Sequence, residues 1–323
     1  MASAFPSLKH LGSLPYTTPA SRLRTLDIWL PTPSPTAPSP SLWLIYLHGG
    51  AWHDPLQDST CINPLLSHLS STHSTTLASL AGIASLNYRL SPYPAHPTHP
   101  STPSDADRTA KHPTHVRDVA AALRFLQQHH GMKRWLGVGH SCGATMLAQL
   151  VAGIGAADDE DPDAAAPPTG PEALVLLEGI YNIPLLLRNH APPACPQHIS
   201  DIYRAFVGHA FGPDADDKAL LAASPVSGKY NAEQWPDGRL LLICHSYEDE
   251  LVERAQRDVM CVALDRQGWS IVMEAGDEED EVRAEGRRVL NVRDLKGGHD
   301  EIWEDGRQIA TLVAEVVQRL GGK

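Results

Sequence analysis

The pentapeptide Gly-His-Ser-Cys-Gly at residues 139–143 is the feature that most constrains the fold of this chain. It follows an apolar run at residues 135–138 and opens a helical pattern that starts at residue 144. A strand that turns directly into a helix places the middle residue, Ser141, on a tight bend with its hydroxyl exposed. The helix N-terminus then offers N–H groups where negative charge develops. A Gly-x-Ser-x-Gly sequence occurs by chance in many proteins, but in this context it predicts a nucleophilic serine.

Apolar runs and helical patterns alternate along the rest of the chain. This alternation is typical of an α/β protein with a mostly parallel central sheet and helices on both faces. Strands are expected at residues 25–30, 42–47, 82–88, 135–139, 173–178 and 240–245. The runs at 270–274 and 289–295 are expected to form one strand region with an insertion. Helices are expected at residues 115–130, 141–154, 251–266 and 301–320.

One domain is expected to span residues 25–323, because no boundary divides the predicted core. Residues 1–24 are interpreted as a loosely ordered N-terminal lead-in. Residues 181–223 are a mixed segment of short helical patterns between two strands, a natural place for a lid over a site. Residues 155–171 and 275–285 are interpreted as solvated acidic insertions.

The net charge of −12 argues against nucleic acid or an anionic membrane as a partner. Most of this charge lies at residues 157–163, which carry five acids, and 274–285, which carry seven acids and one arginine. The rest of the chain is therefore nearly neutral. Five cysteines without a Cys-x-x-Cys pair predict neither a disulfide framework nor a zinc site. No apolar run is long enough for a membrane span and no secretory signal is visible, so a cytoplasmic location is expected.

A glycine-rich motif, His48-Gly49-Gly50-Ala51-Trp52, follows the strand expected at residues 42–47. Acyl transfer through a tetrahedral intermediate needs backbone N–H donors aimed at the oxyanion, and glycines let the chain approach it. We expect the oxyanion donors to be the N–H groups of Gly50, Ala51 and Cys142. His48 is expected to organise the loop rather than to act as a base, and the alternative for the motif is an ordinary Gly-Gly turn.

A serine nucleophile also needs a base and an orienting carboxylate, which follow it in this order on such a sheet. Asp249 comes after the strand expected at 240–245 and is the leading carboxylate, with Glu248 and Glu250 as local rivals. His299 lies on a glycine-bearing loop after the last strand and is the expected base. The thiol of Cys142 is a weaker candidate nucleophile, because it sits on the helix side of the bend.

These segments together resemble the fungal kynurenine formamidases, also called arylformamidases, of the α/β-hydrolase superfamily. The HGGxW motif at residues 48–52 looks like the one that marks this family, whereas related esterases more often carry HGGG. The likeness runs from about residue 25 to the end. Its further segments are Asn87–Pro92, His112-Pro113 with Val116–Val119, Gly139–Ala144, His245–Val252 and Gly298–Asp300.

The resemblance implies an α/β-hydrolase fold with a small helical lid. It also implies hydrolysis of N-formyl-L-kynurenine to formate and L-kynurenine, in tryptophan catabolism and NAD synthesis. The partner is then a small aromatic formamide, and the chemistry needs no metal or organic cofactor. Trp52, Tyr88, Tyr181 and Tyr247 could wall an aromatic pocket, although core packing is the simpler role for each.

Two other functions stay open at this point. One is a broad carboxylesterase of the hormone-sensitive-lipase-like group, and the other is a non-catalytic binding protein with a hydrolase fold. The second is disfavoured because candidates for serine, aspartate and histidine all stand in the required order. The sequence is compatible with a homodimer but does not decide the oligomeric state.

Overall fold

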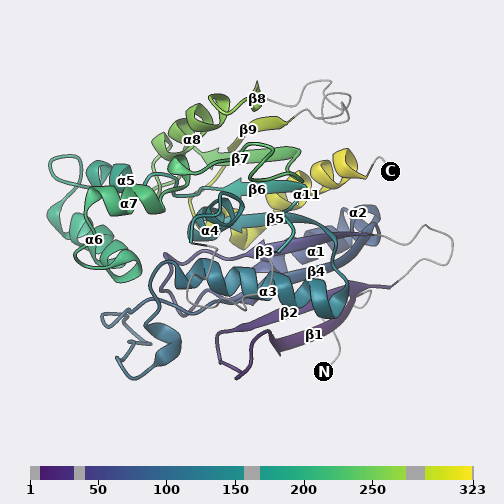
Figure 1. The fold of residues 1–323 in the computed structure, drawn as a ribbon, viewed down its shortest axis with the longest axis horizontal. Helices are drawn as coiled ribbons and strands as arrows, with labels where there is room; N and C mark the ends of the chain where they lie inside the picture. Colours follow the sequence, from purple (N-terminus) through teal and green to yellow (C-terminus); the bar gives the residue numbers. More distant parts are fainter. Residues whose placement is uncertain (1–7, 33–40, 156–167, 274–287, 322–323) are drawn as a thin grey trace.

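A nine-stranded sheet forms the centre of the protein in the computed structural model, which describes residues 8–32, 41–155, 168–273 and 288–321 (Figure 1). The strand order is β1-β2-β4-β3-β5-β6-β7-β9-β8. The strands are β1 (Leu8–Pro15), β2 (Thr25–Pro31), β3 (Leu42–Leu47), β4 (Leu80–Leu86), β5 (Arg134–His140), β6 (Ala173–Leu177), β7 (Leu240–Ser246), β8 (Ser270–Met273) and β9 (Val289–Leu295). The pairs β1–β2 and β2–β4 are antiparallel and the other six are parallel, which confirms the predicted mostly parallel sheet.

Helices cover both faces of this sheet, as expected. The side chains of β3 show why: Trp43, Ile45 and Leu47 belong to one buried cluster, and the alternate residues to the other. Because both faces are buried, such strands are continuous apolar runs. The first cluster includes apolar residues of α3 (Thr114–His130), α4 (Cys142–Val151) and α8 (Ala255–Asp265), and the second those of α1 (Asn63–Ser71), α2 (Ser74–Ala78), α10 (Glu301–Asp305) and α11 (Arg307–Leu320).

A small helical segment lies between β6 and β7 in the chain, within the region expected to form a lid. It consists of α5 (Ile183–Asn189), α6 (Gln197–Phe211) and α7 (Asp217–Ala223), which Figure 1 shows together beyond one end of the sheet. Ile202, Tyr203 and Phe206 of α6 line a pocket together with Ser141. Since Ser141 follows β5 directly, α6 lies over the carboxyl ends of the parallel strands.

The lead-in expected at residues 1–24 is wrong for Leu8–Pro15, which form the edge strand β1. The pairing of β1 with β2 shifts register between Leu11 and Leu14, so the apolar residues do not alternate with polar ones as a regular strand predicts. Most of β1 is also exposed: Leu8 is buried in one cluster with Trp29 of β2, while Leu11 and Leu14 are only partly buried against the other cluster. An exposed, irregular edge strand leaves little pattern in the sequence.

Three further expectations need correction. The runs at 270–274 and 289–295 are not one interrupted strand, because β8 and β9 lie side by side in parallel. The helix expected from residue 251 begins at Ala255, and the helix expected over 301–320 is divided into α10 and α11 at Gly306, whose φ is 70°.

The acidic stretches at residues 157–163 and 274–285 lie outside the described residues, so their interpretation as insertions stays a prediction. Within the parts of the chain that the structure describes, no helix is both long and apolar enough to cross a membrane.

Candidate active site

Ser141 occupies the turn between β5 and α4. Its φ of 53° and ψ of −124° are a conformation that residues other than glycine seldom adopt. The N–H of Ser141 donates to the carbonyl of Leu177 at 2.8 Å, which ties the turn to the neighbouring strand β6. The side chain is mostly buried but still lines the pocket. The predicted strand–turn–helix bend at Ser141 is therefore confirmed.

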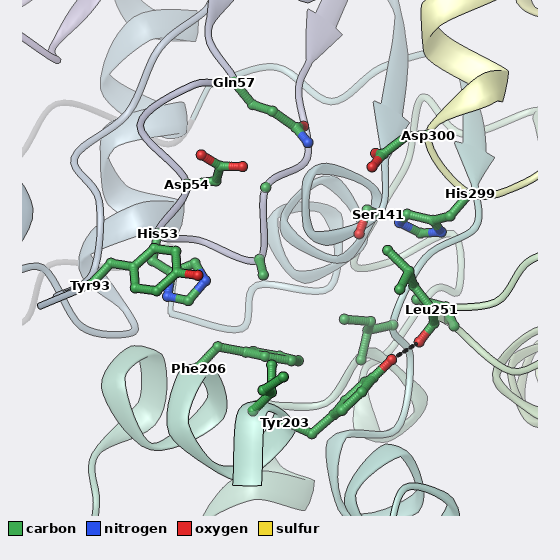
Figure 2. Close-up of a pocket in the computed structure, with 15 residues that line it drawn as sticks. His53, Asp54, Gln57, Tyr93, Ser141, Tyr203, Phe206, Leu251, His299 and Asp300 are labelled. Atoms are coloured by element: carbon green, nitrogen blue, oxygen red, sulfur yellow. Dashed lines mark hydrogen bonds between the residues drawn. The ribbon is translucent and has the colours of Figure 1, made fainter. Parts of the chain in front are cut away.

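The structure brings His299 and Asp249 into direct contact, although they lie far apart in the chain. His299 Nδ1 is 2.9 Å from Asp249 Oδ2, and Asp249 Oδ1 accepts the N–H groups of Leu251 and Val252. Figure 2 shows the Ser141 side chain beside the imidazole of His299. An imidazole whose Nδ1–H donates to a carboxylate has a free lone pair on Nε2, which is the form that accepts a serine proton.

The two rival carboxylates have different places. Glu248 and Glu250 are both exposed, whereas the side chain of Asp249 is fully buried. Glu250 Oε2 accepts the backbone N–H of His299 at 3.1 Å, so Glu250 supports the histidine loop rather than the ring. Of the three acids, Asp249 is the one whose carboxylate contacts the imidazole nitrogen.

The loop after β3 approaches the start of α4. Gly50, Ala51 and Trp52 have φ values of 92°, 47° and 61°, three successive residues in the left-handed region. Glycine adopts this conformation freely, but Ala51 and Trp52 are strained in it. Such strain persists only where the surroundings fix it, and it gathers at functional sites. The N–H of Trp52 donates to Cys142 Sγ at 3.2 Å, while Gly50 and Ala51 line the same pocket as Ser141. The three expected oxyanion donors thus belong to two segments that meet beside the serine.

His48 supports this loop from the core. Its ring stacks on Tyr88 with 4.5 Å between centroids, and the Tyr88 hydroxyl donates to the carbonyl of Gly49 at 2.8 Å. Burial lowers the pKa of His48 to about 4, so the ring is neutral at pH 7. The contacts agree with the expectation that His48 organises the loop.

The Cys142 thiol is fully buried and accepts a hydrogen bond from Trp52 N–H. Burial raises the pKa of this thiol to about 11, so it stays protonated at neutral pH. A protonated, buried thiol is a poor nucleophile. The side chain of Cys142 therefore fastens the glycine loop to α4, and its backbone N–H lies at the first turn of that helix.

The pocket beside Ser141 has an apolar wall from α6 and a polar side from the glycine loop (Figure 2). The aromatic residues that line it are Tyr93, Tyr203 and Phe206. None of the four aromatic residues considered from the sequence lines this pocket. Trp52, Tyr88 and Tyr181 are buried in the core, which confirms the simpler role expected for them, and Tyr247 is 62% exposed. The spacing of Tyr203 and Phe206 on one helix face is a signal that could have identified them.

Sequence reasoning also missed Glu178, which follows β6 directly and is completely buried. Its Oε2 lies 3.5 Å from His299 Nδ1, on the side of the ring that Asp249 contacts. An acidic residue at the carboxyl end of an otherwise apolar strand, next to the strand of the nucleophile, was the available signal.

Two groups of side chains bring possible metal ligands within 4.8 Å of one another. They are Glu178 with Asp249 and His299, and His140 with His299 and Asp300. Both groups include His299, whose Nδ1 already bonds Asp249. A metal ion held by Glu178, Asp249 and the Nδ1 atom of His299 would compete with the contact between His299 and Asp249.

Comparison with curated proteins gives relatives along nearly the whole chain, although no protein-family model matches it. The chain is 34% identical over 320 residues to the kynurenine formamidase-like hydrolase fscH of Fusarium equiseti, which covers 97% of this chain and 96% of the relative. It is 28% identical over 314 residues to the kynurenine formamidase avaC of Aspergillus versicolor, covering 94% and 98%. The kynurenine formamidase of Saccharomyces cerevisiae is 28% identical over 229 residues, covering 68% and 75%.

Solved structures of esterases share the fold. A truncated carbohydrate esterase from gut microbiota matches with a TM-score of 0.62 at 14% identity, over 98% of this chain and 99% of that one. The butyrate-bound esterase Est2 of Thermogutta terrifontis matches with a TM-score of 0.61 at 14% identity, over 98% and 96%. With this fold and a relative 34% identical along almost its full length, the chain belongs to the kynurenine formamidase family of α/β-hydrolases.

Proposed function

We propose that this protein hydrolyses the formamide bond of N-formyl-L-kynurenine, releasing formate and L-kynurenine, with Ser141, His299 and Asp249 as a catalytic triad. The observation that carries the proposal is the buried bond of 2.9 Å between His299 Nδ1 and Asp249 Oδ2, beside a serine on a strand-to-helix turn. The names of the relatives, from fscH to the yeast enzyme, support a formamide as the substrate.

The mechanism follows from these positions. His299 takes the proton of Ser141, and the serine oxygen attacks the formyl carbon. The N–H groups of Gly50, Ala51 and Cys142 stabilise the oxyanion. The arylamine then leaves with the proton held by His299, and water, activated by the same histidine, releases formate from Ser141. Asp249 stabilises the imidazolium that forms in both steps.

The pocket suits an aromatic leaving group. Tyr203 and Phe206 of α6, with Ile180 and Ile202, give it an apolar wall that can bury a ring. Asp54 and His53 lie on the glycine loop, and Figure 2 shows them away from Ser141 and His299. A substrate with its formyl group at Ser141 would thus place its ring against the lid and its polar side chain toward the loop.

The second candidate is a broad carboxylesterase, with which the shared fold of the esterase structures is compatible. We expect kcat/KM for N-formyl-L-kynurenine to exceed that for p-nitrophenyl acetate and p-nitrophenyl butyrate by at least about tenfold. Binding of the kynurenine ring in the pocket would stabilise the transition state for cleavage of the formamide. Absorbance assays of kynurenine and p-nitrophenol release measure both rates on the same purified protein. A clear preference for the esters would replace the formamidase proposal by the esterase one.

The oxyanion loop gives a further prediction. Gly50→Ala should lower kcat by about 10²-fold, because loss of one preorganised donor costs this much or more. The methyl group would meet Cβ atoms of Asp54 and Gln57 at 3.1 and 3.3 Å in a backbone of φ 92°, so the loop must move. Steady-state kinetics measure the effect.

Gly131→Ala is the matched control for this variant. Gly131 also has a positive φ, of 66°, but it ends α3 and no atom lies within 4 Å of the added methyl group. The control should lose some stability and keep its kcat. Equal kcat values for the two variants would argue against Gly50 as part of the oxyanion site.

A further inference from the structure

Glu178 is held in the core in a way that costs stability. Its side chain is completely buried, and neither carboxyl oxygen receives a well-formed hydrogen bond within the described part of the chain. Its φ is 52°, in the left-handed region, while its N–H donates to the carbonyl of Cys244 on β7. An unpaired buried polar group and a strained backbone are each unfavourable, and both together point to a role beyond packing.

The carboxyl of Glu178 faces the catalytic histidine. Glu178 Oε2 lies 3.5 Å from His299 Nδ1 and 3.4 Å from His140 Nε2. Ligand atoms of Glu178, Asp249 and His299 all lie within 4.8 Å of one another. Two carboxyl groups therefore converge on one ring nitrogen, Asp249 at 2.9 Å and Glu178 at 3.5 Å.

The hydrogen-bond donors at this edge of the ring gather on Asp249. Asp249 accepts N–H groups from the backbones of Leu251 and Val252 and from the ring of His299. Glu178 has weaker support, because the backbone N–H of Ser246 acts on it without a well-formed hydrogen bond. Two adjacent carboxylates also repel each other.

The other groups around Glu178 also favour its protonated form. Burial, followed by the charge of Asp249, raises the pKa of Glu178 to about 9, and Glu250 and Asp300 act in the same direction. The Ser246 backbone N–H acts the opposite way, but more weakly than these first two causes. Burial lowers the pKa of His140, so this neighbour is neutral and adds no positive charge.

We propose that Glu178 is a positioning residue and the reserve acid of His299. The two carboxyl groups hold one proton and one negative charge at the Nδ1 edge of the ring. Glu178 keeps the proton while Asp249 is ionised. When Asp249 is lost, Glu178 releases its proton to water, and its carboxylate accepts the Nδ1–H bond. This inference rests on the proposed serine hydrolase function.

The test compares Asp249→Asn with Asp249→Asn/Glu178→Gln. Loss of the acid from a triad otherwise lowers kcat by about 10⁴-fold. We expect Asp249→Asn alone to lose only about 10²-fold, and the double variant to show the full loss. Glu178→Gln alone should lose less than about tenfold in kcat with an unchanged KM, because Asp249 still holds the ring.

The pH profile supplies a readout that a purely structural role would not change. In Asp249→Asn the active form has Glu178 ionised, and burial keeps its pKa above that of an exposed carboxyl. The residual rate of Asp249→Asn should therefore rise as the pH passes the pKa of Glu178. The pH profiles of the wild-type protein and the double variant should lack this rise. Asp249→Ala, measured in parallel, must behave like Asp249→Asn, which excludes recovery of aspartate by deamidation.

Glu172→Gln is the matched control, since Glu172 precedes the same strand β6 but pairs with Arg134 at the opposite end. It should change stability and leave kcat and the pH profile unaltered. Equal rates and pH profiles for Asp249→Asn and the double variant would overturn the proposal. If the wild type cleaves p-nitrophenyl acetate but not N-formyl-L-kynurenine, the proposed substrate is wrong, and the same variants test Glu178 on the ester.

Discussion

Ser141→Ala should lower kcat for N-formyl-L-kynurenine by about four to six orders of magnitude. The variant loses the oxygen that forms the covalent intermediate, while the pocket, the imidazole and the oxyanion donors remain. Its KM should change little, because Tyr203, Phe206 and the glycine loop, which line the pocket and which we propose to contact the substrate, are unchanged. The rate should stay above the uncatalysed reaction, since oxyanion stabilisation and binding still act on attack by water. Stopped or continuous assays of kynurenine release, with long incubation for the variant, measure the loss.

Ser85→Ala is a suitable control for this variant. Ser85 is a fully buried serine of β4 whose hydroxyl has no hydrogen-bond partner within the described residues, and it does not line the pocket. Its replacement should leave kcat within about twofold, because surroundings without a polar partner tolerate the loss of a hydroxyl. Retention of most activity by Ser141→Ala would refute the serine mechanism. If Ser141→Ala loses formamidase activity but cleaves esters at the wild-type rate, the serine mechanism is refuted for ester cleavage.

The sequence predicted the inner strands and the turn at Ser141, because consecutive residues determine each of them. The strands that lie inside the sheet are apolar runs because both of their faces are covered, as the two clusters around β3 show. The turn at Ser141 was predictable because a strand, a strained residue and a helix occupy consecutive positions. The contact of His299 with Asp249 joins residues far apart in the chain. It could still be predicted, because Asp249 follows β7 and His299 follows β9, which are neighbouring strands.

The features that could not be predicted, the strand β1, the pair of strands β8 and β9 and the burial of Glu178, depend on contacts between distant segments that leave no local pattern. The edge strand β1 pairs through its backbone and carries a register shift, so its side chains do not alternate. The separate strands β8 and β9 share a parallel ladder that periodicity does not distinguish from one interrupted strand. Glu178 looked like the polar end of a strand, because its burial beneath His299 arises only when β6 and the histidine loop meet.

Gly143→Ala should destabilise the protein by about 3 kcal/mol, although the change adds a single methyl group to a helix. A Cβ at this position would lie 2.3 Å from the carbonyl oxygen of Leu47 and 2.6 Å from that of His48. Both are backbone atoms at the end of β3, so neither can turn away as a side chain would. The start of α4 and the glycine loop must separate instead. Denaturant titration followed by intrinsic fluorescence measures the loss of stability.

The same displacement links stability to catalysis. The loop with Gly50 and Ala51 begins at His48, and the hydrogen bond from Trp52 N–H to Cys142 Sγ fastens it to α4. If the two segments move apart, the three proposed oxyanion donors no longer point to one place, so the folded fraction of Gly143→Ala should also lose about 10²-fold in kcat. Gly208→Ala in α6 provides the contrast. The nearest atom that its added methyl group would meet is the Cα of Pro213 at 3.6 Å, an ordinary contact, and alanine favours a helix. A Gly143→Ala protein as stable and active as Gly208→Ala would show that the contact of α4 with the end of β3 does not hold the oxyanion site in place.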